Sequence, residues 1–444
     1  MRGMREPTKL SAVDEFTSFV GNMSLVRQKG RVTGVVGIII ESLGPNVPIG
    51  EFCEIRNGRG PAIDAEVVGF KGEKTLLMPF GDMHGIAPGS EVVSSGRPLS
   101  VMVSDSIAGR VLDGLGRPID GKGPILGGMP RAVHAMPPRP LSRRRIIKPM
   151  PLGIRAVDGL LTCGCGQRLG IFSGSGVGKS STMGMIARFT RADINVIALV
   201  GERGREVREF LERDLGEEGL SRSVVVVSTS DTSPLSRIKA PYTATTIAEY
   251  FRDKGMDVVL MVDSITRFAF AQREMGLASG EPPTTRGYTP SLFVALPKLL
   301  ERAGQSDRGS ITGLYNVLVE ADDMNEPVAD HVRSILDGHV VLDRRLAHRN
   351  IYPPVDLLQS VSRVMPDITS EEHFNLMRRF REILATYQEA EDLINIGAYV
   401  KGSNPKIDYA ISRIDRIFDY VRQGLYEKMD YEDSIAGLKA IFEG

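Results

Sequence analysis

The sequence is poor in the residue types that build disulfide frameworks and metal clusters. Its 444 residues include six histidines and only three cysteines, Cys53, Cys163 and Cys165. An odd and sparse set of cysteines does not form a disulfide framework, so the composition favours a reducing cytoplasm. Cys163 and Cys165 are two positions apart with no histidine close by, which is not the spacing of a tetrahedral metal site. We therefore predict that these cysteines are small buried thiols.

The sequence also lacks net charge, long apolar runs and a secretory signal. Its 55 Lys and Arg residues balance 55 Asp and Glu residues, which argues against a protein that coats nucleic acid through bulk charge. No run reaches the roughly 18 apolar residues of a membrane span. The opening MRGMREPTKLSAVDEF has charges where a signal peptide has an apolar core. What remains, 42% hydrophobic and 25% charged residues, is typical of a soluble protein, and the length suggests two to four domains.

The first of four regions, residues 1–28, has the apolar periodicity of a short amphipathic helix. Apolar residues recur at spacings of three and four, at Leu10, Val13, Phe16, Phe19, Val20 and Met23. Such a stripe either packs on the domain that carries it or docks a partner protein, and the periodicity leaves both interpretations open.

Three further regions follow, each with its own pattern. Residues 29–97 consist of short β-rich runs separated by turn signals such as GPNVPIG, which predicts a small β-barrel. A connector rich in Gly and Pro then opens residues 98–366, which contain the apolar runs RLGIF, INVIALV, SVVVVS and DVVLMVD. Such continuous runs are typical of a parallel sheet buried on both faces, with crossover helices between its strands. Residues 367–444 are helical in period and predict a C-terminal α-helical domain.

A glycine-rich turn between an apolar run and a helical segment predicts a phosphate-binding loop. GIFSGSGVGKSS, residues 170–181, matches the pattern Gly, four residues, Gly-Lys-Ser, except that Ser173 replaces the first glycine. Backbone N–H groups of such a turn converge on a phosphate at the positive end of the following helix. Lys179 would contact the β- and γ-phosphates, and the Ser180 hydroxyl would bind Mg²⁺. The predicted ATP-binding residues of this loop are Gly174, Ser175, Gly176, Val177, Gly178, Lys179, Ser180 and Ser181.

Two acidic residues stand at the ends of apolar runs, where a parallel sheet would bring them to the edge that carries Lys179. Asp263 ends DVVLMVD and fits a carboxylate that organises Mg²⁺ through a coordinated water. Glu202 follows INVIALV and could orient the water that attacks the γ-phosphate. Its position alone fits equally well a surface ion pair with Arg203 or Arg205.

These motifs occur together with further blocks, among them GEPPTTRGYTPSLF, GSITGLYNVLVEADDMNEPVAD, LLMPFGDMHGIAPGSEV and IYPPVDLLQSVSRVM. Together the blocks resemble the rotary-ATPase family of hexameric P-loop ATPases, and most of all the ATPases of the flagellar and type III protein export apparatus. The resemblance covers nearly the whole chain. It implies an α/β P-loop (RecA-like) ATPase core with an N-terminal β-barrel and a C-terminal α-helical domain.

The resemblance also implies roles for single residues. Glu202 matches the family's catalytic glutamate, and Asp263 matches the Walker B acid that binds the metal together with Ser180. Arg363, in SVSRVM, matches an arginine finger that reaches into the neighbouring subunit's site. Tyr352, in IYPPVD, matches the position that stacks on adenine. The catalytic residues are thus expected to be Lys179, Glu202 and Arg363.

Related classes fit less well. A catalytic subunit of a rotary ATP synthase would carry an acidic helix-loop motif where this chain has YVKGSNPKID, with Lys401 and Lys406. Non-catalytic subunits lack either the intact P-loop or the glutamate, and a degenerate binding module would not keep the complete catalytic set. A Rho-like RNA translocase shares DSITR, but the barrel region has no aromatic cluster interleaved with Lys and Arg. Flagellar and virulence type III ATPases share every catalytic block, so the sequence does not separate them.

The resemblance implies a homohexamer that couples ATP hydrolysis, with Mg²⁺ as cofactor, to protein export. It would act in the cytoplasm, peripherally at the inner-membrane export apparatus. The expected partners are a regulatory stator-like protein on the N-terminal helix, a central stalk protein, export chaperones with their substrates, and the membrane export gate, with no specific nucleic acid. The segment from Ser279 to Tyr288 resembles a loop that faces the central channel, where it would contact the stalk or a substrate; a purely structural loop is the alternative.

Overall fold

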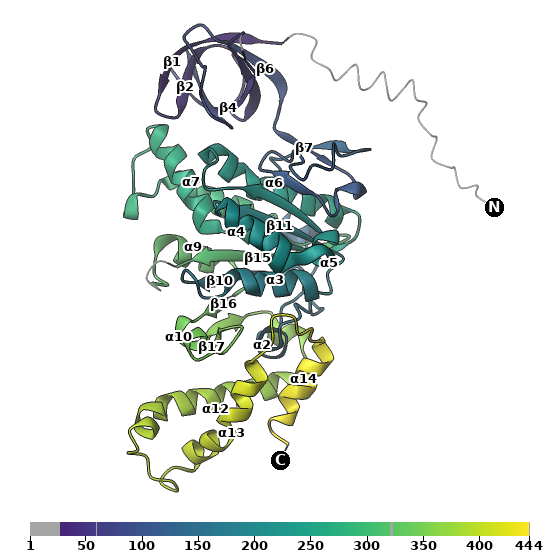
Figure 1. Ribbon diagram of the computed structural model, residues 1–444, viewed down its shortest axis with the longest axis vertical. Coiled ribbons are helices and arrows are strands. Elements are labelled where there is room, and N and C mark those ends of the chain that lie inside the picture. Colours follow the sequence, from purple (N-terminus) through teal and green to yellow (C-terminus); the bar gives the residue numbers. More distant parts are fainter. Residues whose placement is uncertain (1–26, 59, 320–322, 444) are drawn as a thin grey trace, which may run out of the picture. The chain divides into compact units, whose positions relative to one another are not determined.

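The computed structural model describes residues 27–58, 60–319 and 323–443, and the chain divides into two compact units, residues 1–98 and 99–444 (Figure 1). The predicted amphipathic helix of residues 1–28 lies outside the described residues, apart from its last two positions. Within the described ranges, no helix combines the length and the apolar character needed to cross a membrane.

The first unit is a closed antiparallel β-barrel with the strand order β1-β2-β5-β4-β3-β6. Successive side chains of a strand point to opposite faces, so alternate residues such as Val32, Ile40, Ile55 and Leu77 fill the interior. The predicted N-terminal barrel is therefore confirmed. Its strands are β1 (Lys29–Val36), β2 (Ile39–Leu43), β3 (Glu51–Arg56), β4 (Ile63–Lys71), β5 (Lys74–Pro79) and β6 (Glu91–Pro98).

The second unit is built on a sheet with the order β17-β16-β10-β15-β13-β11-β12-β8. The strands from β16 to β8 run parallel, whereas β17 closes one side antiparallel to β16 and the short β14 pairs antiparallel with β15. The apolar runs expected to be buried parallel strands form β10 to β13, as predicted. The strands are β8 (Val111–Asp113), β10 (Arg168–Ser173), β11 (Ile194–Val200), β12 (Ser223–Ser228), β13 (Asp257–Asp263), β14 (Gly304–Gln305), β15 (Ser310–Leu318), β16 (Gly338–Leu342) and β17 (Val355–Ser362).

Helices cover both faces of this sheet, because the strands between its margins carry apolar side chains on both faces. Met183 and Ile186 of α3 share one hydrophobic cluster with Ile197, Leu199 and Met261 of the sheet, while α6 packs against β11, β12 and β13. The crossover and connecting helices are α2 (Arg155–Leu160), α3 (Lys179–Phe189), α4 (Gly204–Glu209), α5 (Gly216–Ser221), α6 (Pro234–Asp253), α7 (Ile265–Ala278), α8 (Pro290–Leu300), α9 (Pro327–Ile335), α10 (Arg344–His348) and α11 (Met365–Ile368). Single turns of other helix types are η1 (Asp105–Ile107), η2 (Pro140–Ser142), the π-helical η3 (Phe210–Leu215) and η4 (Thr285–Gly287).

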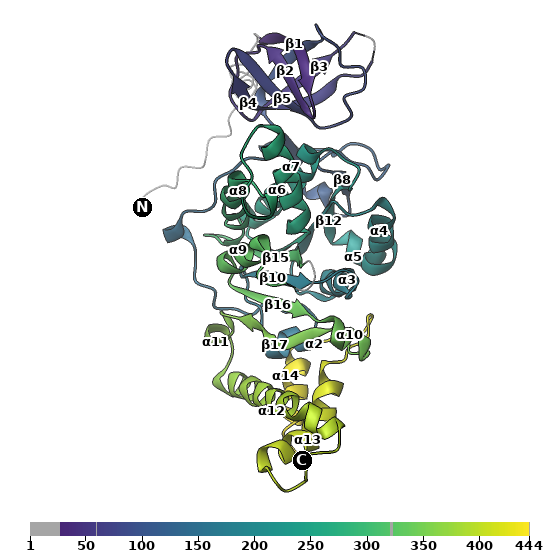
Figure 2. The ribbon, with the colours of Figure 1, turned by 90° about the vertical axis from the view of Figure 1, so that its left-hand side faces the viewer.

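Three helices follow the sheet, α12 (Glu371–Asn395), α13 (Pro405–Val421) and α14 (Tyr431–Ala440), and they lie beyond the β17 side (Figure 2). Phe380 of α12 and Tyr420 of α13 belong to the same hydrophobic core, and the Tyr420 hydroxyl donates to the Ser434 carbonyl at 2.9 Å. The predicted α-helical domain is confirmed. The helical period of residues 367–444 does not show where this helix stops, and α13 ends at Val421. Gln423 instead binds the core, donating from Nε2 to the Gly153 carbonyl at 2.9 Å.

The connector rich in Gly and Pro contains more regular structure than its sequence indicates. β8 adds a strand to the sheet beside β12, and β9 (Met129–Ala132) pairs antiparallel with β7 (Ser100–Val103). Strands of three or four residues are too short to show a period of two, so sequence patterns miss them.

Candidate active site

The phosphate-binding loop occupies the turn from β10 into α3. Gly176 and Gly178 have φ angles of 76° and 101°, in the left-handed region that glycine adopts without strain, and Gly178 caps the first turn of α3. The first N–H groups of a helix have no intrahelical partners and are free to bind an anion. Ser173, at the position of the missing glycine, is buried, and its hydroxyl makes no hydrogen bond within the described part of the chain. The substitution therefore leaves the glycine turn itself intact.

Lys179, the first residue of α3, lies between two carboxylates. Its Nζ is 2.6 Å from Oδ1 of Asp263, the last residue of β13, and 3.3 Å from Oε1 of Glu202, which follows β11. The three side chains are largely buried, with exposed fractions of 11%, 4% and 17%. Burial lowers the pKa of Lys179, but the charges of Asp263 and Glu202 outweigh it and raise the pKa above the ordinary value. The parallel sheet thus brings the three predicted side chains together at its carboxyl edge.

Glu202 is the more weakly held of the two carboxylates. Burial raises its pKa to about 7, Lys179 opposes that shift, and the charge of Asp263 and a hydrogen bond with Glu206 add to it. The same hydrogen bond lowers the pKa of Glu206, so the two carboxyl groups titrate as a pair. Arg203 and Arg205 pair instead with Glu206 and Glu209, and neither takes Glu202 as its partner in the described residues.

Glu206 also belongs to the cluster around Lys179, although it was not among the residues predicted from the sequence. It stands four positions after Glu202, across the first turn of α4, in GERGREVREF. A carboxylate repeated at that spacing on a segment leaving the sheet edge was the available signal.

The remaining loop residues line the same turn. Ser180 is exposed in the first turn of α3, next to the half-buried Ser181. The Arg344 guanidinium donates to the carbonyl of Ser175 at 3.0 Å, and Val177 is buried beneath the loop. The loop is therefore supported from the segment that follows β16.

Tyr352 lies against this loop, although 173 positions separate it from Lys179 along the chain. A Cβ atom placed on Gly178 would stand 3.7 Å from the Tyr352 ring, and 45% of the tyrosine remains exposed. The Gln423 backbone N–H donates to the Tyr352 carbonyl at 2.8 Å, which ties this turn to the helical domain. The ring is thus available as a flat apolar surface beside the loop.

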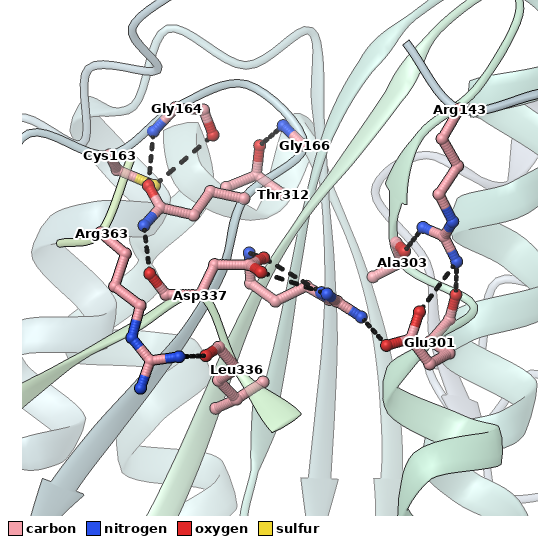
Figure 3. Close-up of polar contacts among 12 residues, drawn as sticks. Arg143, Cys163, Gly164, Gly166, Glu301, Ala303, Thr312, Leu336, Asp337 and Arg363 are labelled. Carbon is pink, nitrogen blue, oxygen red and sulfur yellow. Dashed lines mark hydrogen bonds and ion pairs between the residues drawn. The ribbon is translucent and has the colours of Figure 1, made fainter. Parts of the chain in front are cut away.

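Arg363 is not brought together with the other predicted catalytic residues. It follows β17, whose Ser362 pairs with Gly338 at the start of β16, so Arg363 lies at the amino edge of the sheet. In Figure 2, α10 and α11 mark the two opposite ends of β17, and α11 begins just after Arg363. A six-residue strand such as β10 separates the two edges by about 20 Å. Arg363 is exposed there, and its Nη1 lies 3.5 Å from the Leu336 carbonyl (Figure 3).

The donor set at the carboxyl edge consists of hard oxygen ligands. A hydroxyl from Ser180 and a carboxylate from Asp263 suit Mg²⁺, which binds proteins through one or two such groups and completes its shell with phosphate oxygens and water. No group of three His, Cys, Asp or Glu side chains that could hold a metal occurs in the described ranges. The Ser180 hydroxyl and the Asp263 carboxylate fit a metal that arrives with a nucleotide.

A parallel sheet, a glycine loop opening onto Lys179 and acidic residues at the ends of neighbouring strands define a P-loop nucleoside triphosphatase. Comparisons with known proteins narrow this class. Residues 32–96 and 153–362 match the β-barrel and nucleotide-binding domains of the ATP synthase alpha/beta family, and residues 369–440 match the T3SS EscN ATPase C-terminal domain.

The chain belongs to the ATP synthase alpha/beta family, and it is an ATPase. It is 55% identical to the flagellum-specific ATP synthase of Bacillus subtilis (strain 168), over 94% of this chain and 95% of that protein. It is 50% identical to the type 3 secretion system ATPase of Xanthomonas euvesicatoria, over 95% and 96%. Among solved structures it is similar to the assembled ATPase EscN of enteropathogenic E. coli in complex with its central stalk EscO. That match has a TM-score of 0.86 and 45% identity, over 93% of this chain and 99% of that one. The predicted family and enzyme class are confirmed.

Proposed function

We propose that this chain hydrolyses ATP to drive protein export through a flagellar-type (type III) apparatus, releasing chaperones and delivering substrates at the membrane export gate. Identity of 50–55% to a flagellar and a type III secretion ATPase, over nearly the full length, supports this function. The observation that carries the chemistry is the contact of Lys179 with Asp263 and Glu202 at one edge of the sheet. A cation for the phosphates, an acid for the metal and an acid for the water are the groups that phosphoryl transfer requires.

The loop would hold the triphosphate through its backbone. Gly176 and Gly178 allow the N–H groups of the turn to face the phosphates, together with the N-terminus of α3. Lys179 would then exchange the carboxylates of Asp263 and Glu202 for the β- and γ-phosphate oxygens. Gly174, Ser175, Val177 and Ser181 would complete the loop around the nucleotide.

Ser180 and Asp263 would hold Mg²⁺, the serine through its hydroxyl and the aspartate through a water. When bound, the ion would neutralise charge on the β- and γ-phosphates. Release of Asp263 from Lys179 frees the carboxylate for this role.

Glu202 would orient the attacking water and draw on its proton. A pKa of about 7, caused first by burial, is close to the value at which a carboxylate works well as a base at neutral pH. Glu206 accepts a hydrogen bond from the protonated form of Glu202 and provides a neighbouring site for the proton.

Arg363 would act on the site of a neighbouring subunit. It lies at the opposite edge of the sheet from its own Lys179, so within one chain it does not reach the γ-phosphate. A subunit with a P-loop on one edge and a finger on the other would make head-to-tail contacts, which generate a ring when the rotation between subunits closes. We propose a homohexamer with one active site at each interface.

The outer parts of the chain would serve recognition. Tyr352 would stack on adenine, since its exposed ring lies against the loop. Residues 1–28 would bind a stator-like regulator, and a central stalk would contact the ring, as EscO does in its complex with EscN. We propose domain limits of 29–97, 98–366 and 367–444 for the barrel, the ATPase core and the helical domain, and action in the cytoplasm at the inner-membrane export apparatus.

One pair of assays tests this function. Glu202→Gln should bind ATP with unchanged affinity while its phosphate release falls by about 10²–10³-fold, because the group that orients the water is lost. Loss of nucleotide binding would make Glu202 structural. The wild-type gene, introduced into bacteria that lack either a flagellar or a virulence export ATPase, should restore export in one of the two, whereas Glu202→Gln should restore neither. Restoration of neither by the active enzyme would contradict the export function.

A further inference from the structure

A chain of ion pairs lies near Arg363 at the amino edge of the sheet. Arg168, the first residue of β10, holds the Asp337 carboxylate with two side-chain bonds, Nε to Oδ2 and Nη2 to Oδ1, both 3.1 Å. The Arg168 backbone N–H donates to the same carboxylate at 3.0 Å. Such a two-pronged arginine–carboxylate contact fixes the position of both groups.

The Arg168 guanidinium is held from its other side as well. It pairs with Glu301, which in turn binds Arg143 with 3.2 Å between Oε2 and Nη2. Arg143 also donates to the Ala303 carbonyl at 2.7 Å (Figure 3). The Arg168 side chain is only 14% exposed, so its orientation is set by these partners rather than by solvent. The two-pronged contact with Asp337 and the pair with Glu301 thus fix the direction of the guanidinium.

Asp337 connects this network to Arg363 through its main chain. The Asp337 carbonyl accepts the backbone N–H of Arg363 at 3.1 Å and the Gln167 side-chain amide at 3.2 Å, and the Leu336 carbonyl receives the arginine Nη1 at 3.5 Å. Figure 3 shows Arg363 beside Leu336 and Asp337, with its guanidinium next to the Leu336 carbonyl. The side chain of Asp337 is therefore anchored to β10 while its main chain carries Arg363.

Arg363 depends on this anchorage because its side chain has little other support. It is exposed, and the 3.5 Å contact to a carbonyl is its single side-chain hydrogen bond among the described residues. A group that stabilises a transition state must be held to within a fraction of an ångström, and a shift of about 1 Å can cost about 10²-fold in rate.

We propose that Arg168 and Asp337 are positioning residues for Arg363, so that one subunit's ion pair sets the rate at its neighbour's active site. The proposal rests on the proposed action of Arg363 across the interface. A purely local role is the competing explanation, because β10 leads from Arg168 into the P-loop of the same subunit. If the ion pair positions Arg363, its loss impairs the active site of the neighbouring subunit. If its role is local, its loss impairs the active site of the same subunit.

Mixed rings tell these explanations apart. Lys179→Ala subunits have no working P-loop but keep Arg363 and its anchor, so they can serve as finger donors. Asp337→Asn alone should lose about 10-fold or more in kcat, with the Kd for ATP unchanged. Assembled at equal amounts with Lys179→Ala, it should regain activity above the sum of the two proteins measured apart, since about a quarter of the interfaces in a random ring join a working P-loop to an intact finger. Arg363→Ala mixed with Lys179→Ala provides the reference.

Each outcome has one meaning. Rescue of Arg363→Ala without rescue of Asp337→Asn would overturn the positioning role and leave the proposed function standing. Failure to rescue Arg363→Ala would overturn action across the interface itself, and the positioning role with it. An unchanged kcat for Asp337→Asn, or failure of this variant to form rings by light scattering, would also overturn the proposal.

Two further variants distinguish a loss of positioning from a general loss of protein stability. Arg168→Lys keeps the charge but loses the two-pronged contact, and it should show the same kcat defect and the same rescue. Asp120→Asn is the matched control, because Asp120 holds Arg110 through two contacts of 2.7 and 3.0 Å in an even more buried pair beside β8, at the far side of the sheet. It should leave kcat in assembled rings unchanged within about 2-fold. An equal kcat defect with equal rescue in Asp120→Asn would overturn the positioning role, because the loss of an ion pair far from Arg363 would then have the same effect.

Discussion

The two edges of the central sheet present their charges in opposite physical settings. At the carboxyl edge Lys179, Asp263 and Glu202 are largely buried and pair with one another within one chain. At the amino edge Arg363 is exposed, and its guanidinium has one long contact to a carbonyl. A buried charge cluster can be built only where its members satisfy each other, whereas an exposed arginine at an edge is free to find its partner on another molecule. One chain therefore completes the carboxyl-edge half of the proposed site by itself, whereas Arg363 is the half that it presents to a neighbouring subunit.

Removal of the lysine from the carboxyl edge should have the largest effect on ATP turnover. Lys179→Ala should lower ATP turnover by about 10⁴-fold, since the lysine serves both the binding of the phosphates and the charge that develops during transfer. It also leaves Asp263 and Glu202 close together without a cation. Phosphate release by the purified protein measures the loss.

Lys254→Ala is the control for the lysine variant. Lys254 pairs with Asp105 on the surface, so its removal should leave turnover unchanged. A Lys179→Ala protein with more than about a tenth of wild-type turnover would contradict the assignment of the loop.

Removal of the arginine should abolish only the dependence of ATP turnover on neighbouring subunits. Arg363→Ala should fold and bind ATP as the wild type does, yet lose about 10³-fold in turnover under conditions in which the wild type is assembled. The specific activity of the wild type should rise with protein concentration, and that of Arg363→Ala should stay flat. Arg333→Ala, which removes a half-buried arginine paired with the exposed Asp330, should keep the rise. A rise of equal size in Arg363→Ala would mean that the arginine does not act between subunits.

The sequence predicts the carboxyl edge better than the amino edge, for a physical reason. Glycine spacing and a strand that ends in Asp263 are local signals, and parallel strands necessarily bring their carboxyl ends to one side. The contact of Asp337 with Arg168 joins residues 169 positions apart and has no local pattern. The short β8 and the end of α13 at Val421 were missed because tertiary contacts, not periodicity, determine them. Glu206 had a usable spacing signal, but only the structure shows that its side chain is hydrogen-bonded to Glu202 and that its pKa is lowered by that bond.

Tyr352 sharpens the comparison with a smaller effect, since it belongs to the carboxyl edge but lies outside the charge cluster. Tyr352→Ala should raise the KM for ATP by about 10-fold through loss of base stacking, and kcat should change little. Tyr352→Phe keeps the ring and should restore the wild-type KM. An equal KM for ATP in Tyr352→Ala and the wild type would show that the ring does not contact the base.

The pH dependence of stability tests the burial of the carboxylate with the smallest effect. The pKa of Glu202 is raised in the folded protein to about 7 from an ordinary value of 4.5, so the fold favours the protonated acid. That contribution is fully present below about pH 4.5 and is lost as the pH rises through 7, because the unfolded chain then releases the proton more readily than the folded one. Glu202→Gln stays neutral throughout. Its melting temperature, measured without nucleotide, should therefore rise relative to wild type between pH 5 and 8, by about 2 °C.

A second carboxylate with the opposite shift provides the control for that measurement. Arg191 donates a hydrogen bond to Glu432 and lowers its pKa, so the stabilising charge of Glu432 is already complete above the ordinary value of 4.5. The melting temperature of Glu432→Gln should consequently run parallel to that of the wild type from pH 5 to 8. If Glu202→Gln also runs parallel, the carboxylate is ionised across this range and Lys179 holds it as firmly as it holds Asp263. The exchange of partners by Lys179 would then have to displace two charged carboxylates rather than one, and the near-neutral base proposed for the attacking water would be lost.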